Sequence, residues 1–142
     1  MTMRLFSLLL FVTLGSSSTL FSQATPKCTE PSRLTDDDAR ILLYVAPVSI
    51  AARRAGTDVD LEQSSPSKQF PAADYFVAAI VSQKPTSGSV LDNGILGYYA
   101  VDKRSGVVES ITDFTRVNSK ELSRIQAWMR HSHCIQMVKP RK

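Results

Sequence analysis

The chain has 142 residues, with 17 lysines and arginines, 13 aspartates and glutamates and a net charge of +4. This length suits one domain with a single modest core. The two signs of charge are interleaved, and no basic stripe with aromatic platforms is present, so we expect no nucleic acid among the partners.

Residues 1–24 are predicted to be a secretory signal peptide. Arg4 provides a positive start, and the apolar run from Leu5 to Gly15 is about half as long as a membrane-spanning helix requires. Small residues at Ser22 and Ala24 fit the positions that a signal peptidase reads. We therefore expect cleavage after Ala24, no membrane span in the cleaved chain and a secreted or periplasmic location; an uncleaved anchor is the alternative.

The chain contains two cysteines, Cys28 and Cys134. In an exported protein such a pair predicts a disulfide bond. The bond would close a loop of about 100 residues, for which the chain-entropy estimate is roughly 4 to 5 kcal/mol of stabilisation. We predict that residues 25–136 form one domain and that residues 137–142 form a basic flexible tail.

Thr35 followed by three aspartates predicts the start of a helix. Thr35 can cap the first turn and Asp38 stands at the reciprocal capping position. The helix continues as one apolar stripe with spacings of four, three and four residues: Ile41, Val45, Val48 and Ala52. Pro47 is expected to kink this helix or divide it in two, and Gly56 marks its end.

A long polar stretch, residues 57–73, follows the first helix. Its alternating segment Asp58–Glu62 is expected to be a short edge strand with Val59 and Leu61 pointing inward. Connections as long as this stretch are often functional or mobile. The next segment, Tyr75–Val81, is apolar on both alternating faces, as is typical of a central strand.

Residues 97–110, with the sequence GYYAVDKRSGVVES, predict a β-hairpin. One strand ends at Asp102, the next begins at Val107, and the four residues KRSG lie between them. Asp102 can accept hydrogen bonds from the amides of the turn, and Gly106 can adopt the positive φ that closes it. Each residue has a conformational role that needs no ligand, so we predict a turn and not a binding site.

The last element is predicted to be a helix that begins at Asn118, with Glu121 three residues later, and ends near His133. Its inner stripe consists of Leu122, Ile125 and Met129. The expected fold class is therefore α+β: an N-terminal helix packed on a small antiparallel sheet of three or four strands, followed by a C-terminal helix.

The predicted hairpin contains the pattern Y-x-V-D-x-x-[ST]-G-x-V, at Tyr99, Val101, Asp102, Ser105, Gly106 and Val108. Together with the preceding helix and strands, residues 35–111 resemble the PepSY domain family. The resemblance implies a small extracytoplasmic binding or inhibitory module without a shared catalytic site.

Tyr98 and Tyr99 point to opposite faces of the predicted strand, so one can lie in the core while the other meets an outer surface. Burial of both rings, in the core or under a helix, is the interpretation we favour. An exposed tyrosine beside Trp128 or Phe70 would be the natural centre of a binding patch. The candidate binding-surface residues are therefore Tyr98, Tyr99, Trp128 and Phe70.

His131, His133 and Cys134 are residue types that bind zinc. On a helix the two histidines point about 200° apart, and Cys134 is required by the predicted disulfide. We therefore expect solvated histidines, no bound metal and no other cofactor. We name no catalytic residue, because no G-x-S-x-G motif is present and a disulfide would silence both thiols.

These observations predict a small secreted or periplasmic module that is not an enzyme and that binds or inhibits a partner. The expected partner is another extracytoplasmic protein or a component of the cell envelope. The alternative is a small hydrolase that uses carboxylates or a metal near the C-terminal helix, since paired carboxylates need no local motif. A third hypothesis is a structural accessory of the envelope, held by the basic tail.

Overall fold

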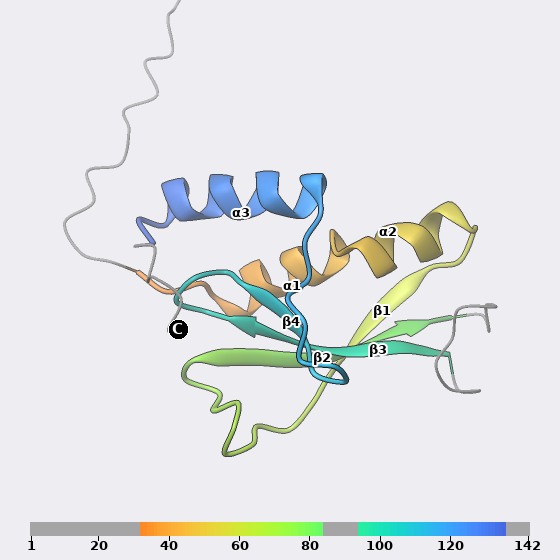
Figure 1. Cartoon of the computed structure of the whole chain (residues 1–142), viewed down its shortest axis with the longest axis horizontal. Coiled ribbons are helices and arrows are strands. Elements are labelled where there is room, and N and C mark those ends of the chain that lie inside the picture. Colours follow the sequence, from red (N-terminus) through yellow and green to blue (C-terminus); the bar gives the residue numbers. More distant parts are fainter. Residues whose placement is uncertain (1–31, 84–93, 136–142) are drawn as a thin grey trace, which may run out of the picture.

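The computed structural model describes residues 32–83 and 94–135 and has an α+β fold, which confirms the fold class expected from the sequence (Figure 1). The predicted signal peptide, Cys28 and the predicted basic tail lie outside the described residues. The helices and strands occur in the order α1 (Asp36–Tyr44), α2 (Pro47–Arg54), β1 (Val59–Gln63), β2 (Tyr75–Ser82), β3 (Ile95–Asp102), β4 (Val108–Ser110) and α3 (Lys120–Ser132).

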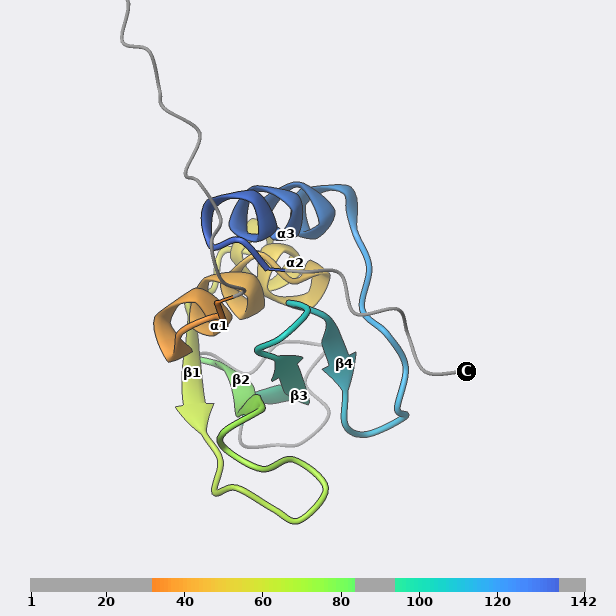
Figure 2. The ribbon, with the colours of Figure 1, turned by 90° about the vertical axis from the view of Figure 1, so that its left-hand side faces the viewer.

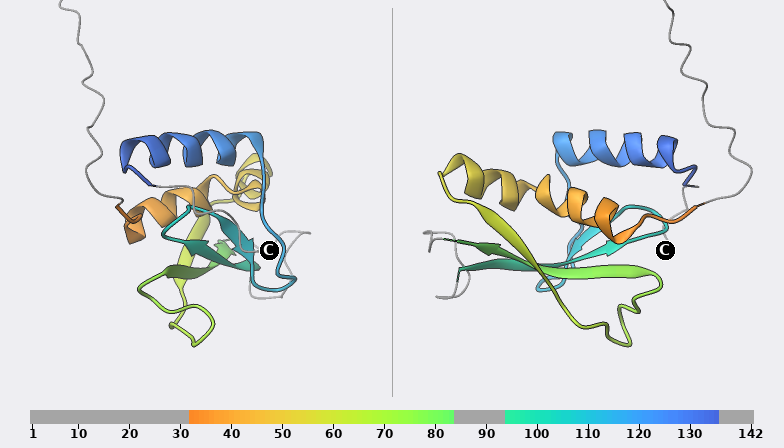
Figure 3. Two further views of the ribbon diagram at one scale, coloured as in Figure 1. Left: turned by 60° about the vertical axis from the view of Figure 1, so that its left-hand side comes forward. Right: turned by 180° about the vertical axis from the view of Figure 1, so that it is seen from behind.

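The four strands form one antiparallel sheet in the order β1-β2-β3-β4. The helices lie on one side of this sheet (Figures 1 and 2). Helices α1 and α2 follow one another along its face, and α3 lies over α1 on the outer side (Figure 3). No helix of the described residues covers the opposite face, called here the open face, which carries Ala79, Tyr98 and Ala100.

The core lies between the sheet and the helices. Alternation along β2 and β3 directs Phe76, Ile80 and Val101 toward the helices, where their side chains are fully buried. Leu42 and Leu43 of α1 are buried against them. Burying one such side chain is worth roughly 1.5 to 3 kcal/mol, so this layer supplies the main driving force for folding.

The start and the interruption of the first helix are as predicted. Thr35 Oγ1 accepts a hydrogen bond from Asp38 N at 3.1 Å, and Asp38 Oδ2 accepts one from Thr35 N at 2.9 Å. Pro47 divides the helix, because it is the first residue of α2. At that position its missing N–H would have no helical partner in any case.

The polar stretch 57–73 is anchored to the domain. Its first part forms β1, an edge strand as predicted, with Leu61 buried. In its second part the ring of Phe70 meets Tyr75 edge to face, with the ring centroids 5.2 Å apart. Phe70 N also donates a hydrogen bond to Ser67 Oγ at 3.1 Å. Phe70 therefore joins the connection between β1 and β2 to the start of β2.

Helix α3 begins one residue later than predicted. Ser119, and not Asn118, is its N-cap, because the Ser119 hydroxyl accepts a hydrogen bond from Leu122 N at 3.0 Å. Leu122 and Met129 are buried, as the predicted inner stripe requires. In residues 32–83 and 94–135, neither α3 nor any other helix has the length and apolarity needed to cross a membrane.

Candidate functional site

The predicted turn between β3 and β4, Lys103–Gly106, is confirmed. Asp102 N donates to Val107 O at 2.9 Å, and Gly106 N donates to Asp102 O at 2.7 Å. The Asp102 carboxylate accepts hydrogen bonds from Arg104 N and Ser105 Oγ, both at 2.8 Å. Gly106 has a φ of 70°, the conformation for which glycine was expected there.

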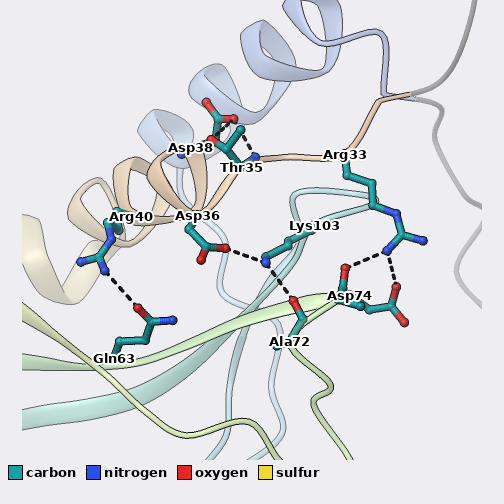
Figure 4. A network of polar contacts seen from close by, with 10 residues as sticks. Arg33, Thr35, Asp36, Asp38, Arg40, Gln63, Ala72, Asp74 and Lys103 are labelled. Atoms are coloured by element: carbon teal, nitrogen blue, oxygen red, sulfur yellow. Dashed lines mark hydrogen bonds and ion pairs between the residues drawn. The ribbon is translucent and has the colours of Figure 1, made fainter.

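The charged side chains of this turn contact other parts of the domain, and Figure 4 shows the contacts of Lys103. Lys103 Nζ lies 2.6 Å from Asp36 Oδ1. Arg104 and Arg33 both pair with Asp74 Oδ1, each at 2.7 Å. These contacts tie the turn to α1 and to the residues before β2, so its charged groups stabilise the fold.

A second tight turn follows β4. Ser110 N donates to Thr115 O and Val117 N donates to Val108 O, each at 2.9 Å. β4 and residues 115–117 therefore form the two sides of a short hairpin. The four residues that connect them, Ile111, Thr112, Asp113 and Phe114, are called here the hairpin tip.

Phe114 is the last residue of the hairpin tip. It has a φ of 53°, and its side chain is 65% exposed. A left-handed conformation costs a residue with a Cβ about 1 to 2 kcal/mol, and an exposed ring recovers little of this by burial. Strained residues of this kind are often found where a protein contacts something else, so Phe114 is a candidate contact residue.

Asp113 fixes the conformation of the hairpin tip. Its Oδ1 accepts a hydrogen bond from Thr115 N at 3.4 Å. Hydrogen bonds from the side chains of Ser110 and then Thr115 hold the pKa of Asp113 below its ordinary value. The Asp113 carboxyl is therefore ionised at neutral pH and is held close to the backbone of the turn.

The two tyrosines of β3 point to opposite faces of the sheet, as predicted. Tyr99 is half-buried on the helix side, and its ring lies so close to Gly97 that a Cβ there would come within 2.9 Å of it. Tyr98 lies on the open face and is 39% exposed. The favoured expectation that both rings are buried is therefore wrong, because no helix of the described residues covers Tyr98.

The hairpin tip lies beside these tyrosines. Tyr98 O accepts a hydrogen bond from Ile111 N at 2.9 Å. Burial, and secondly the charge of Asp113, raises the pKa of Tyr99. Figures 1 and 2 show the tip at the β4 edge of the sheet and away from the helices. Four residues therefore form the candidate site, called here the aromatic hairpin surface: Tyr98, Ile111, Asp113 and Phe114.

The other two candidate surface residues lie elsewhere. Phe70 is only 9% exposed, so its prediction as a surface residue is wrong; its ring packs on Tyr75 instead. Trp128 is 59% exposed, but it belongs to α3, on the opposite side of the molecule from the open face (Figure 1). The fold therefore places neither residue beside Tyr98.

Phe114 is not among the contact residues predicted from the sequence. It is the only aromatic residue between Tyr99 and Trp128, and polar residues precede and follow it. An isolated aromatic residue in a polar segment is the signal that could have identified it. The same signal marks Phe70, however, and Phe70 is buried.

His131, His133 and Cys134 do not converge as a set of metal ligands. His131 is exposed, whereas His133 Nε2 lies 3.3 Å from Asp38 Oδ1. Burial alone would raise the pKa of Asp38, but hydrogen bonds from Thr35 and the charge of His133 lower it overall. Within the part of the chain that the structure describes, no group of three or more His, Cys, Asp or Glu side chains is arranged to hold a metal ion.

The disulfide between Cys28 and Cys134 stays a prediction, because the structure describes only Cys134. Cys134 follows α3 directly and has a φ of 55°. Ile135 N donates back to Arg130 O at 3.0 Å, which closes the last turn of the helix. Its predicted partner Cys28 lies outside the described residues.

A small pocket lies between the β1–β2 connection and α1, with Asp36, Phe70, Tyr75 and Lys103 among its lining residues. Its volume of about 30 Å³ is close to the space that one water molecule occupies in the liquid. Asp36 and Lys103 already pair with each other in it. This pocket is too small for a metabolite, and we assign it no ligand.

No model of a known protein family matches the chain, and no curated protein matches it. The resemblance to the PepSY family therefore stays a prediction. Among solved structures, the fold is similar to that of a chain in a type VI secretion system effector–immunity complex from Pseudomonas protegens. The TM-score is 0.54 with 17% sequence identity, and the match covers 74% of this chain and 81% of that chain. At this identity the likeness shows the fold alone.

Proposed function

We propose that this chain is a small exported protein that binds and inhibits another protein without catalysing a reaction itself. The observation that carries the proposal is the aromatic hairpin surface. Two aromatic side chains, Tyr98 and Phe114, are exposed, Ile111 at the start of the hairpin tip is hydrogen-bonded to Tyr98, and the turn that holds Phe114 is strained. Aromatic residues supply much of the binding energy at protein interfaces.

The likeness in fold to a chain of an effector–immunity complex supports a protein as the partner. In such a complex one protein is bound to another, and we assign this chain the role of the inhibiting partner. The export of the chain rests on residues 1–24, which read as a signal peptide. Intact mass of the mature protein tests this part, because cleavage after Ala24 leaves a product that begins at Thr25.

Inhibition is tested with the full chain in its own organism. We would cross-link the tagged chain in the secreted and periplasmic fractions, purify the bound protein and measure that protein's activity as the chain is added. The expected result is a loss of activity that is complete at a fixed molar ratio. A matched control is Leu122→Asp, which places a charge at a fully buried position and should abolish both folding and binding.

Two results would contradict the proposal. If no protein is bound in either fraction, the chain is not an interaction module there. If the bound protein keeps its full activity when it is saturated with the chain, the interaction is real but the inhibitory role is wrong.

A further inference from the structure

We propose that the hairpin tip inserts into the partner, with Phe114 in an apolar pocket and Asp113 against a lysine or arginine at the rim of that pocket. The inference rests on the proposed function, because it names the surface through which the module would bind. It commits to one kind of occupant: a protein pocket with an apolar floor and a cationic rim.

The first argument is that folding does not require a phenylalanine at position 114. The matched position of the preceding turn is Gly106, with a φ of 70°, and a Cβ there would lie 3.4 Å from Leu34 Cδ1. Phe114 has a similar φ of 53°, but its ring is exposed and does not contribute to the core. A side chain that occupies a strained backbone position and lies outside the core of the described residues is suited to pack on a partner.

The second argument is that the tip is held in one conformation. The hydrogen bond from Ser110 N to Thr115 O closes its base, and the one from Ile111 N to Tyr98 O joins it to β3. A contact residue on a fixed turn loses little conformational freedom on binding. Tyr98 is joined to the tip through this hydrogen bond and is itself exposed, so it can add to the apolar contact.

The third argument is charge complementarity. Asp113 is exposed, and in residues 32–83 and 94–135 it takes part in no ion pair within the chain. Its hydrogen bonds come from Ser110 and Thr115, which are neutral. Arg116, the nearest cation along the chain, lies opposite Glu109 in an isolated bridge. An exposed carboxylate that forms no ion pair with any described lysine or arginine, next in sequence to an exposed ring, favours a partner with lysine or arginine there.

The test begins with photo-crosslinking in the secreted and periplasmic fractions. The full chain carries p-benzoylphenylalanine at position 114 in one variant and at position 128 in the other. Both positions are exposed aromatic residues, but they lie on different sides of the molecule. An adduct from position 114 alone does not test the insertion model, so the two positions are compared. We expect one protein to react from position 114 and not from position 128, with the modified residues in a pocket that has lysine or arginine at its rim.

Affinity for the adducted protein is then measured with Phe114→Gly and, as the matched control, Trp128→Ala. Glycine keeps the left-handed backbone and removes only the ring. We expect Phe114→Gly to weaken binding at least about 30-fold, the effect of a dominant interface residue, while Trp128→Ala changes it less than about 2-fold. Thermal unfolding of Phe114→Gly should show no lower midpoint than the wild type, which separates a binding role from a structural one.

The charge is tested with Asp113→Asn. We expect slower association at low salt and a difference from the wild type that shrinks as salt is added. Three results would overturn the insertion model and leave the proposal of a protein partner standing. They are an unchanged affinity of Phe114→Gly, a reaction from position 128 alone, and an adduct with a second copy of this chain. Reaction from neither position would contradict the proposed function as well.

Discussion

The two turns on either side of β4 have the same length and different uses. Each has four residues, and in each the last residue has a positive φ, at Gly106 in the first and at Phe114 in the second. In the first turn, Lys103 and Arg104 pair with aspartates of the same chain. In the second, the aromatic ring is exposed. The charged side chains of the first turn therefore have partners in the same domain. The second turn exposes a ring that lies outside the core of the described residues.

This difference shows how a structural turn and a candidate contact site can be told apart. Backbone geometry alone does not separate them, because both turns are closed by similar hydrogen bonds. The distinction lies in which residue occupies the left-handed position and whether its side chain has a partner in the domain. Adding a side chain at Gly106 should therefore destabilise the fold. Removing the side chain of Phe114 should not destabilise it.

The largest expected effect on the free energy of unfolding comes from removing the predicted disulfide, whose loop contains both turns. The predicted disulfide between Cys28 and Cys134 would enclose them in one loop of about 100 residues. Replacement of both cysteines by serine should lower the free energy of unfolding by roughly 4 to 5 kcal/mol and leave the fold intact. Denaturant unfolding followed by circular dichroism measures this change.

Thiol titration is the control for this prediction. The denatured and unreduced wild-type protein should show no reactive thiol. Two reactive thiols would mean that the disulfide is absent, and the serine variant should then be as stable as the wild type.

The next effect concerns the first turn alone. Gly106→Ala should lower the free energy of unfolding by about 1 to 2 kcal/mol, because alanine is strained at a φ of 70°. The new Cβ would lie 3.4 Å from Leu34 Cδ1, at the edge of ordinary van der Waals contact, so backbone strain is the main cause of the loss. Thermal and denaturant unfolding measure the change. A variant as stable as the wild type would mean that glycine is not required there.

The opposite effect is expected in the second turn. Phe114→Gly relieves the left-handed strain, although glycine also adds freedom to the unfolded chain. The free energy of unfolding should stay unchanged or rise by up to about 1 kcal/mol. The control is Phe114→Ala, which removes the ring and keeps the strain. If Phe114→Ala unfolds more easily than the wild type, the ring supports the fold and the contrast between the turns is lost.

Features with local causes could be predicted from the sequence. The cap at Thr35, the division of the helix at Pro47 and the turn at Gly106 each depend on residues a few positions apart, and each is present in the structure. The alternation that separates Tyr98 from Tyr99 is equally local. The order of elements and the α+β class follow from such signals.

The candidate site could not be predicted in the same way. Phe70 and Phe114 both stand alone in polar segments, and only long-range packing distinguishes them. Phe70 is buried because its connection brings it against Tyr75, while Phe114 is exposed at the end of a hairpin. Trp128 is exposed too, but the arrangement of α3 over α1 places it away from Tyr98. Which aromatic residues share a surface depends on the assembled fold.

The smallest expected effect concerns the carboxylate that holds the second turn. Hydrogen bonds from Ser110 and then Thr115 lower the pKa of Asp113 from its ordinary value of 3.8. Because the folded pKa is the lower one, the ionised group stabilises the folded state above pH 3.8. This contribution is lost as the pH falls through the folded pKa.

An NMR titration of the Asp113 carboxyl should therefore show a midpoint below 3.8. Ser110→Ala removes the first of its hydrogen bonds and should move the midpoint back toward 3.8, while Asp113→Asn should abolish this part of the acid dependence of stability. A midpoint at or above 3.8 in the wild type would mean that Asp113 does not hold the turn. The hairpin tip would then be held by its backbone hydrogen bonds alone, from Ser110 N to Thr115 O and from Ile111 N to Tyr98 O.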